Sequence, residues 1–125
     1  MKFSVAAIIF HKNKYLFQKR DNKKRIFYPN FYGLFGGERN KNEKPIETMR
    51  RELFEEISLK FVKINHLITI KLNSPIFNPK KASIFKRHVF ICELPRDFRK
   101  QIKLNEGQNL KFININKVNK INIAP

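Results

Sequence analysis

The chain has 125 residues, of which 42% are hydrophobic, so we expect one domain over residues 1–125; the length excludes two separate cores and the composition excludes a disordered chain. The net charge is +17, from 27 Lys and Arg against 10 Asp and Glu residues. This balance predicts attraction to the phosphates of nucleotides, nucleic acid or lipid surfaces, whereas Lys residues spread evenly around the molecule would only solvate its surface.

The N-terminal segment predicts a β-hairpin. Phe3–Phe10 is an apolar run with β-branched members, Asn13 supplies a turn, and Lys14–Arg20 continues as a second strand. The apolar run is too short for a signal peptide, and no cleavage site of small residues follows it. No segment approaches the roughly 20 apolar residues that span a membrane. We therefore expect a cytoplasmic protein without membrane association.

A basic loop over Asp21–Pro29 leads into a short aromatic strand. This strand, Phe31–Phe35, is predicted to end at Gly36 and Gly37. Two adjacent glycines permit a backbone turn that a side chain would block.

A helix is predicted to begin at Pro45, because the first helical position tolerates the missing N–H of proline. The apolar residues that follow recur at helical spacing and form a stripe facing the core. This stripe consists of Ile46, Met49, Leu53 and Ile57. The helix is expected to end near Ser58 and Leu59.

The C-terminal half predicts three more strands, at Phe61–Leu72, Ile84–Leu94 and Leu110–Ile115. The connections are a loop over Asn73–Lys81, which holds two prolines, and a loop or short turn over Pro95–Lys103. The tail from Lys117 either forms one helical turn or frays. Several strands around one long helix indicate an α/β or α+β layered domain.

The acidic residues are concentrated in one place. Six of the ten lie between positions 38 and 56, namely Glu38, Glu43, Glu47, Glu52, Glu55 and Glu56. The last three fall within an arc of roughly 100° on one face of the predicted helix. Such a group either forms a solvated face or is neutralised, by Arg51 or by a divalent cation. Mg²⁺ prefers oxygen ligands and often bridges carboxylates to the phosphates of a substrate.

The residues around this group form a spaced motif. From Gly37 the sequence reads Gly, five residues, Glu43, seven residues, and then Arg51-Glu52-Leu53-Phe54-Glu55-Glu56-Ile57-Ser58-Leu59. It resembles the Nudix box, Gly-x5-Glu-x7-Arg-Glu-U-x-Glu-Glu-x-Gly-U, in which U is a bulky aliphatic residue. Only Ser58 departs from the pattern, at a glycine position. A left-handed residue commonly ends a helix there, and serine in that conformation costs roughly 1 kcal/mol or forces another ending.

The resemblance implies the Nudix fold, an α/β/α sandwich with a mixed β-sheet and the box helix packed against it. It implies Glu55 and Glu56 as the main metal ligands, and Glu52 as a further ligand or the general base. Arg51 would pair with Glu43 and orient the helix.

Two further metal ligands are implied outside the helix. One is the carbonyl oxygen of Gly36. The other is Glu106, which lies in a late loop just before the last predicted strand and is otherwise an exposed loop acid.

The candidates for substrate binding rest on residue type. Arg20, at the end of the second predicted strand, is a candidate phosphate contact, and Gly37 is a further candidate for substrate binding. Phe31 and Tyr32 are candidates to stack on a base, since every base has a π-face. Packing in the core is the alternative for these aromatic residues, as it is for Tyr15, Phe17 and Phe77.

The resemblance also implies the reaction, in which water attacks a pyrophosphate bond of a nucleoside diphosphate-linked substrate with Mg²⁺ as cofactor and Mn²⁺ able to substitute. A small MutT-like enzyme that converts a (d)NTP or modified nucleotide to a nucleoside monophosphate and pyrophosphate fits the length. One alternative is an RNA 5′-end pyrophosphohydrolase or RNA-binding Nudix protein, motivated by the charge. Another is a non-catalytic nucleotide-binding module, against which the intact carboxylate set argues. The base, the group X, and the choice between monomer and homodimer stay open.

Overall fold

The computed structural model of the protein describes residues 3–19, 32–60, 62–73, 84–103 and 109–120. Four predicted site or stacking residues lie outside this part of the chain, namely Arg20, Phe31, Phe77 and Glu106. The elements in chain order are β1 (Phe3–His11), β2 (Lys14–Lys19), β3 (Tyr32–Gly33), β4 (Phe35–Glu38), α1 (Pro45–Ile57), β5 (Lys63–Asn73), β6 (Ile84–Glu93), α2 (Phe98–Gln101), β7 (Asn109–Asn114) and the 3₁₀-helix η1 (Ile115–Lys120).

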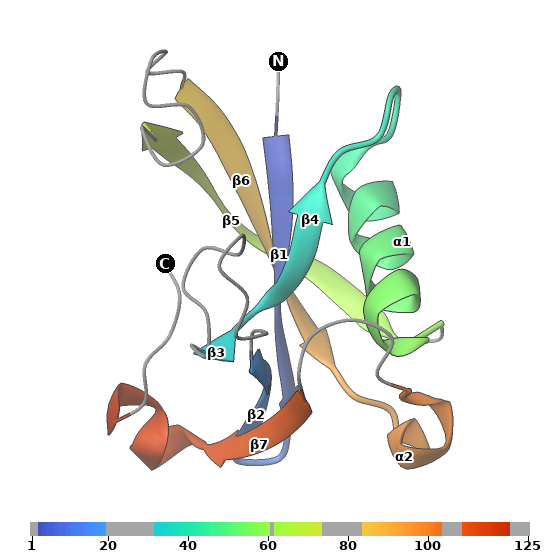
Figure 1. The fold of residues 1–125 in the computed structure, drawn as a ribbon, viewed down its shortest axis with the longest axis vertical. Helices are drawn as coiled ribbons and strands as arrows, with labels where there is room; N and C mark the ends of the chain where they lie inside the picture. Colours follow the sequence, from blue (N-terminus) through green and yellow to red (C-terminus); the bar gives the residue numbers. More distant parts are fainter. Residues whose placement is uncertain (1–2, 20–31, 61, 74–83, 104–108, 121–125) are drawn as a thin grey trace.

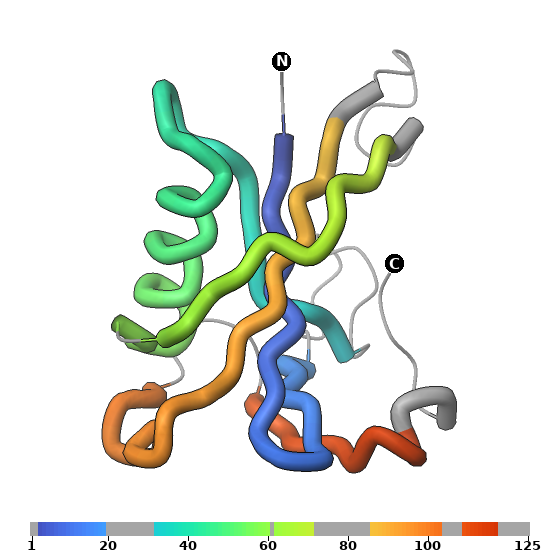
Figure 2. Tube along the Cα trace, turned by 180° about the vertical axis from the view of Figure 1, so that it is seen from behind, coloured from blue at the N-terminus to red at the C-terminus, as the bar shows by residue number. Residues whose placement is uncertain are grey.

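Strand β1 organises the sheet. The strand order is β3-β2-β1-β6-β5, with β4 also paired to β1 and β7 to β2. Strand β1 runs parallel to β6 and antiparallel to β2 and β4, which gives the mixed sheet that was predicted. Figures 1 and 2 show β1 crossing the centre of the molecule, with α1 beside β4 and with β6 and β5 on the other side of β1.

Helix α1 forms where the sequence predicts it. Pro45 occupies its first turn, and the backbone N–H of Lys44 donates to the Oε1 of Glu47 at 2.9 Å, which stabilises the N-terminal end. Met49, Leu53 and Ile57 are fully buried, and partly buried Ile46 packs against the same core.

The buried stripe of α1 belongs to one hydrophobic cluster with the sheet. The sheet contributes Val5, Ala7, Ile9, Leu16, Phe35, Phe90 and Cys92 to this cluster. Each large apolar side chain buried there contributes roughly 1.5–3 kcal/mol. The prediction that the helix carrying the motif packs against a mixed sheet is confirmed.

The glycine pair lies inside a strand, and the prediction that it forms a turn is wrong. Gly36 pairs with Ala6 and Gly37 with Val5, both within β4. A Cβ on Gly36 would collide with the carbonyl oxygen of Val5, so glycine is required by the close approach of two backbones. The predicted strand Phe31–Phe35 is divided, within the described residues, into β3 and β4.

The three strands predicted in the C-terminal half are present as β5, β6 and β7 with shifted boundaries. The predicted loop Asp21–Pro29, and the predicted loop Asn73–Lys81 beyond Asn73, lie outside the described residues. The segment predicted as a loop or short turn contains the single helical turn α2. Of the two outcomes predicted for the tail from Lys117, a helical turn or fraying, the described residues form a helical turn, η1. The backbone N–H of Lys103 donates to the carbonyl of Ile57 at 2.8 Å, which ties the chain after α2 to the end of α1. Among the residues described, no helix is long and apolar enough to cross a membrane.

The end of α1 keeps a left-handed residue without a glycine. Ser58 has φ 59° and ψ 23°, and its backbone N–H donates to the carbonyl of Phe54 at 2.9 Å. The N–H of Leu59 donates to the carbonyl of Leu53 at 3.3 Å, and the Leu59 side chain is buried. Serine therefore adopts the same helix ending that glycine adopts more easily.

Candidate active site

The glutamates of α1 meet the glycine pair of β4. Glu56 is buried, with 4% of its surface exposed. The backbone N–H of Gly36 donates to its Oε1 at 3.3 Å, and the amide of Gln18 on β2 donates to its Oε2 at 3.4 Å. A buried carboxylate needs such partners to compensate for lost hydration. The side chain of Glu56 is thus held between α1, β2 and β4.

Glu52 lies one helical turn earlier on the same face. Its side chain is 12% exposed, and a Cβ on Gly37 would occupy the space of its carboxylate. The bare backbone of Gly37 is therefore what allows Glu52 to lie against β4. Burial raises the pKa of Glu52 above its usual range; Arg51 opposes this shift and the charge of Glu55 adds to it.

Arg51 connects the acidic residues. Its Nε and Nη2 contact the two carboxylate oxygens of Glu43 at 2.8 and 3.0 Å, a bidentate pair. Its Nη1 contacts the Oε1 of Glu52 at 3.0 Å and the Oε2 of Glu55 at 3.1 Å. Its Nη2 also donates to the carbonyl of Glu38 at 2.9 Å. One guanidinium thus contacts three carboxylates and ties the loop before α1 to the helix.

Glu43 is fixed from several sides. The backbone N–H of Asn40 donates to its Oε1 at 2.8 Å, and the hydroxyl of buried Thr48 lies 3.2 Å from the same atom. These contacts, and above all the hydrogen bond from Arg51, lower the pKa of Glu43 to about 2. Glu43 is therefore ionised across the physiological pH range and holds Arg51 in place.

The oxygen donors suit a hard divalent cation, although their side chains are not gathered around one point. Among the described residues, no group of three or more His, Cys, Asp and Glu side chains is placed to hold a metal ion. Glu52 and Glu56 both reach the Gly36–Gly37 segment, while Glu55, with 46% of its side chain exposed, lies at the rim against Arg51. Carboxylate and carbonyl oxygens are the ligands that Mg²⁺ prefers.

The structure brings together most, but not all, of the residues predicted from sequence. Arg51, Glu43, Glu52 and Glu55 form one ion-pair group, and Glu56 lies against Gly36. Tyr32 lies on β3 opposite Lys19, and the Nζ of Lys111 is 5.6 Å from its ring centroid. The placement of Arg20, Phe31 and Glu106 falls outside the described residues.

Two polar residues of the site were missed by the sequence prediction, Gln18 and Thr48. Gln18 shares a face of β2 with Leu16, which is 1% exposed, so a polar side chain stands where the alternation of the strand predicts a core residue. Thr48 is fully buried next to the apolar stripe of α1. A polar residue at a core-facing position was the available signal in both cases.

Comparison with known proteins identifies one family and many solved structures with a similar fold. The family model described as NUDIX domain matches residues 1–125. No curated protein matches the sequence. The E. coli dihydroneopterin triphosphate pyrophosphohydrolase is similar in structure, with a TM-score of 0.76 and 16% identity over 96% of this chain and 85% of that chain.

Two further solved structures are similar. A MutT NUDIX hydrolase from Burkholderia pseudomallei gives a TM-score of 0.73 and 17% identity over 92% of this chain and 84% of that chain. The NUDIX domain of Shewanella oneidensis NrtR, solved with ADP ribose, gives a TM-score of 0.74 and 18% identity over 98% of this chain and 78% of that chain. At these identities the likeness establishes a common fold, and the substrates of those proteins do not transfer with it.

Proposed function

Since the chain belongs to the NUDIX domain family, whose hydrolases act on nucleoside diphosphate derivatives, we propose that this protein hydrolyses a nucleoside triphosphate or modified nucleotide with the help of Mg²⁺. The products are a nucleoside monophosphate and pyrophosphate. The observation that carries the proposal is the position of Glu52 and Glu56 against the Gly36–Gly37 segment, beside the Arg51–Glu43 pair.

The proposed cation ligands are the carboxylates of Glu55 and Glu56 and the carbonyl of Gly36. When bound, the cation polarises a phosphoryl oxygen and lowers the pKa of a water molecule. Hydrogen bonds from Gly36 and Gln18 fix the Glu56 carboxylate. Glu55 is exposed enough to turn away from Arg51 by side-chain rotation.

Glu52 serves as a further ligand or as the general base. Its burial raises its pKa, which brings a carboxylate closer to the pH at which a base works best. As the base, Glu52 takes the proton of the attacking water while the water oxygen forms a bond to phosphorus. The bond from that phosphorus to the bridging oxygen then breaks, and pyrophosphate leaves with the electron pair.

Arg51 and Glu43 are proposed as positioning residues. Glu43 is anchored by Asn40 and Thr48 and carries a lowered pKa, so it holds the guanidinium at neutral pH. Arg51 in turn keeps Glu52 and Glu55 together at a distance that their mutual repulsion would otherwise oppose.

A substrate panel tests the function. Nucleoside triphosphates, modified nucleotides and ADP-ribose are incubated with Mg²⁺ or Mn²⁺, and released pyrophosphate or phosphate is measured. Glu55→Gln and Glu56→Gln are each expected to reduce turnover by about 100-fold or more, because loss of a metal ligand removes several kcal/mol of transition-state stabilisation. Glu93→Gln, at an exposed carboxylate on β6, is the matched control and should retain turnover.

The same panel separates the alternatives. Absence of cleavage of all these compounds with either metal would favour the alternative of a non-catalytic nucleotide-binding module. Full activity in both Glu55→Gln and Glu56→Gln would contradict the assigned roles.

The net charge of +17 favours a second candidate, cleavage at the 5′ end of RNA. A 5′-triphosphorylated oligonucleotide belongs in the panel for this reason. Preference for it that weakens steeply with added salt would support this candidate, because phosphate contacts release counterions.

A further inference from the structure

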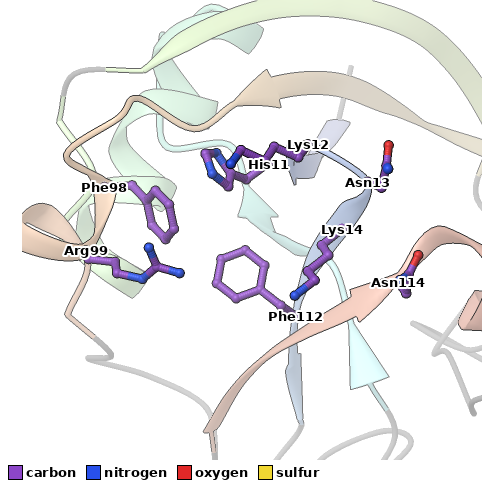
Figure 3. Close-up of a pocket in the computed structure, with 8 residues that line it drawn as sticks. All are labelled: His11, Lys12, Asn13, Lys14, Phe98, Arg99, Phe112 and Asn114. Atoms are coloured by element: carbon purple, nitrogen blue, oxygen red, sulfur yellow. The ribbon is translucent and has the colours of Figure 1, made fainter.

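A concave site lies apart from the carboxylate group. It is a cavity of about 380 Å³ formed by the β1–β2 turn, α2 and β7. Its lining residues are His11, Lys12, Asn13, Lys14, Phe98, Arg99, Phe112 and Asn114. None of these eight belongs to the motif over Gly37–Leu59. Figure 3 shows the side chains of His11, Phe98, Arg99 and Phe112 arranged around a common hollow.

Aromatic rings form the wall of this cavity. The ring centroids of His11 and Phe98 are 4.8 Å apart, and those of Phe98 and Phe112 are 5.6 Å apart with planes inclined by 63°. Phe98 is 3% exposed and fixes the other two, which are partly exposed. His11 and Phe112 therefore offer ring surface to a ligand in positions that packing has already set.

Cations surround the rings. Lys12, Lys14 and Arg99 are all exposed, and the eight lining residues include no acid. The Cζ of Arg99 lies 4.9 Å from the ring centroid of Phe98, a cation–π contact that orients the guanidinium. Partly exposed aromatic ring surface beside three positive charges is complementary to an aromatic ligand that carries negative charge.

We propose that this cavity binds a nucleotide unit, with the base against His11 and Phe112 and the phosphate at Arg99 and Lys14. The volume lies within the range of pockets that enclose small ligands, roughly 300–1,000 Å³. The unit is either a free mononucleotide or one residue of single-stranded RNA. The inference is independent of the proposed hydrolysis, because its residues and those of the carboxylate group do not overlap.

The test is a titration of the intact protein with AMP in the presence of EDTA. Binding is measured from the NMR chemical-shift changes of the backbone amides. AMP has no pyrophosphate bond, and removal of divalent cations weakens binding that depends on them. We expect shifts at the β1–β2 turn, α2 and β7, and weaker binding of adenosine or inorganic phosphate alone. Arg99→Ala and Phe112→Leu should each weaken AMP binding at least about fivefold.

Two control variants locate the site. Lys100→Ala removes an exposed cation of α2 that does not line the cavity, and Glu56→Gln alters the carboxylate group. Both should leave AMP affinity within about twofold of the wild type. Arg99 is exposed, so its variant is expected to fold even if Phe112→Leu does not.

A short oligoadenylate distinguishes the two sources of the ligand. If the oligoadenylate binds more tightly than AMP, with the same sensitivity to Arg99→Ala, the ligand is single-stranded RNA. If the two bind with equal affinity, the ligand is the free nucleotide. The proposal is overturned if neither probe binds, if Arg99→Ala binds as well as the wild type, or if Glu56→Gln abolishes binding.

Discussion

Ser58 offers a direct test of how α1 ends. Its φ of 59° lies in the left-handed region, which costs a residue with a Cβ about 1–2 kcal/mol and costs glycine nothing. Glycine also makes the unfolded chain more flexible, which offsets about 0.4–1 kcal/mol of the gain. Ser58→Gly is therefore expected to increase the free energy of unfolding by about 0.5–1 kcal/mol.

Thermal and urea denaturation followed by circular dichroism measures this change. For a chain of this length the expected increase in Tm is about 2–5 °C. Ser58→Ala is the control, because it removes the hydroxyl but keeps the Cβ and so keeps the strain. If Ser58→Gly is no more stable than Ser58→Ala, the left-handed conformation carries no strain at this position and the reasoning is refuted.

Two further predictions concern the carboxylate group. Gly37→Ala places a Cβ where the Glu52 carboxylate lies, so Glu52 is expected to move off β4. Turnover should fall about tenfold or more while the circular dichroism spectrum is kept, and unchanged turnover would show that this position of Glu52 is not needed. The pKa of Glu43 is lowered to about 2 from an ordinary 4.5, so its contribution to stability is complete above pH 4.5 and is lost as the pH falls toward 2. The difference in urea midpoint between the wild type and Glu43→Gln should shrink over this range; a difference that is constant from pH 6 to about 2.5 would contradict the assigned pKa.

The sequence predicted those parts of the structure that local rules determine. Pro45 and the helical spacing of Met49, Leu53 and Ile57 defined α1, because capping and periodicity depend only on near neighbours. The position of α1 against a mixed sheet was implied by the family resemblance, and the structure bears it out.

Features that depend on distant pairing were missed. Gly36 and Gly37 were taken for a turn because nothing near them in the chain reveals that β1 pairs alongside. The contact of Gln18 with Glu56 joins residues 38 positions apart, which local patterns do not encode. The single turn of α2 is too short for a helical period to be visible.

The contacts of Arg51 have a consequence for the order in which the carboxylate group assembles. Each partner described above lies within 13 positions of Arg51 in the chain. Closing such short loops loses little chain entropy, so the ion-pair group of Arg51 can assemble together with α1, whereas Glu56 acquires its partners only when β2 and β4 are in place. Pairing within one short stretch of chain therefore precedes the long-range contacts that bury the Glu56 carboxylate.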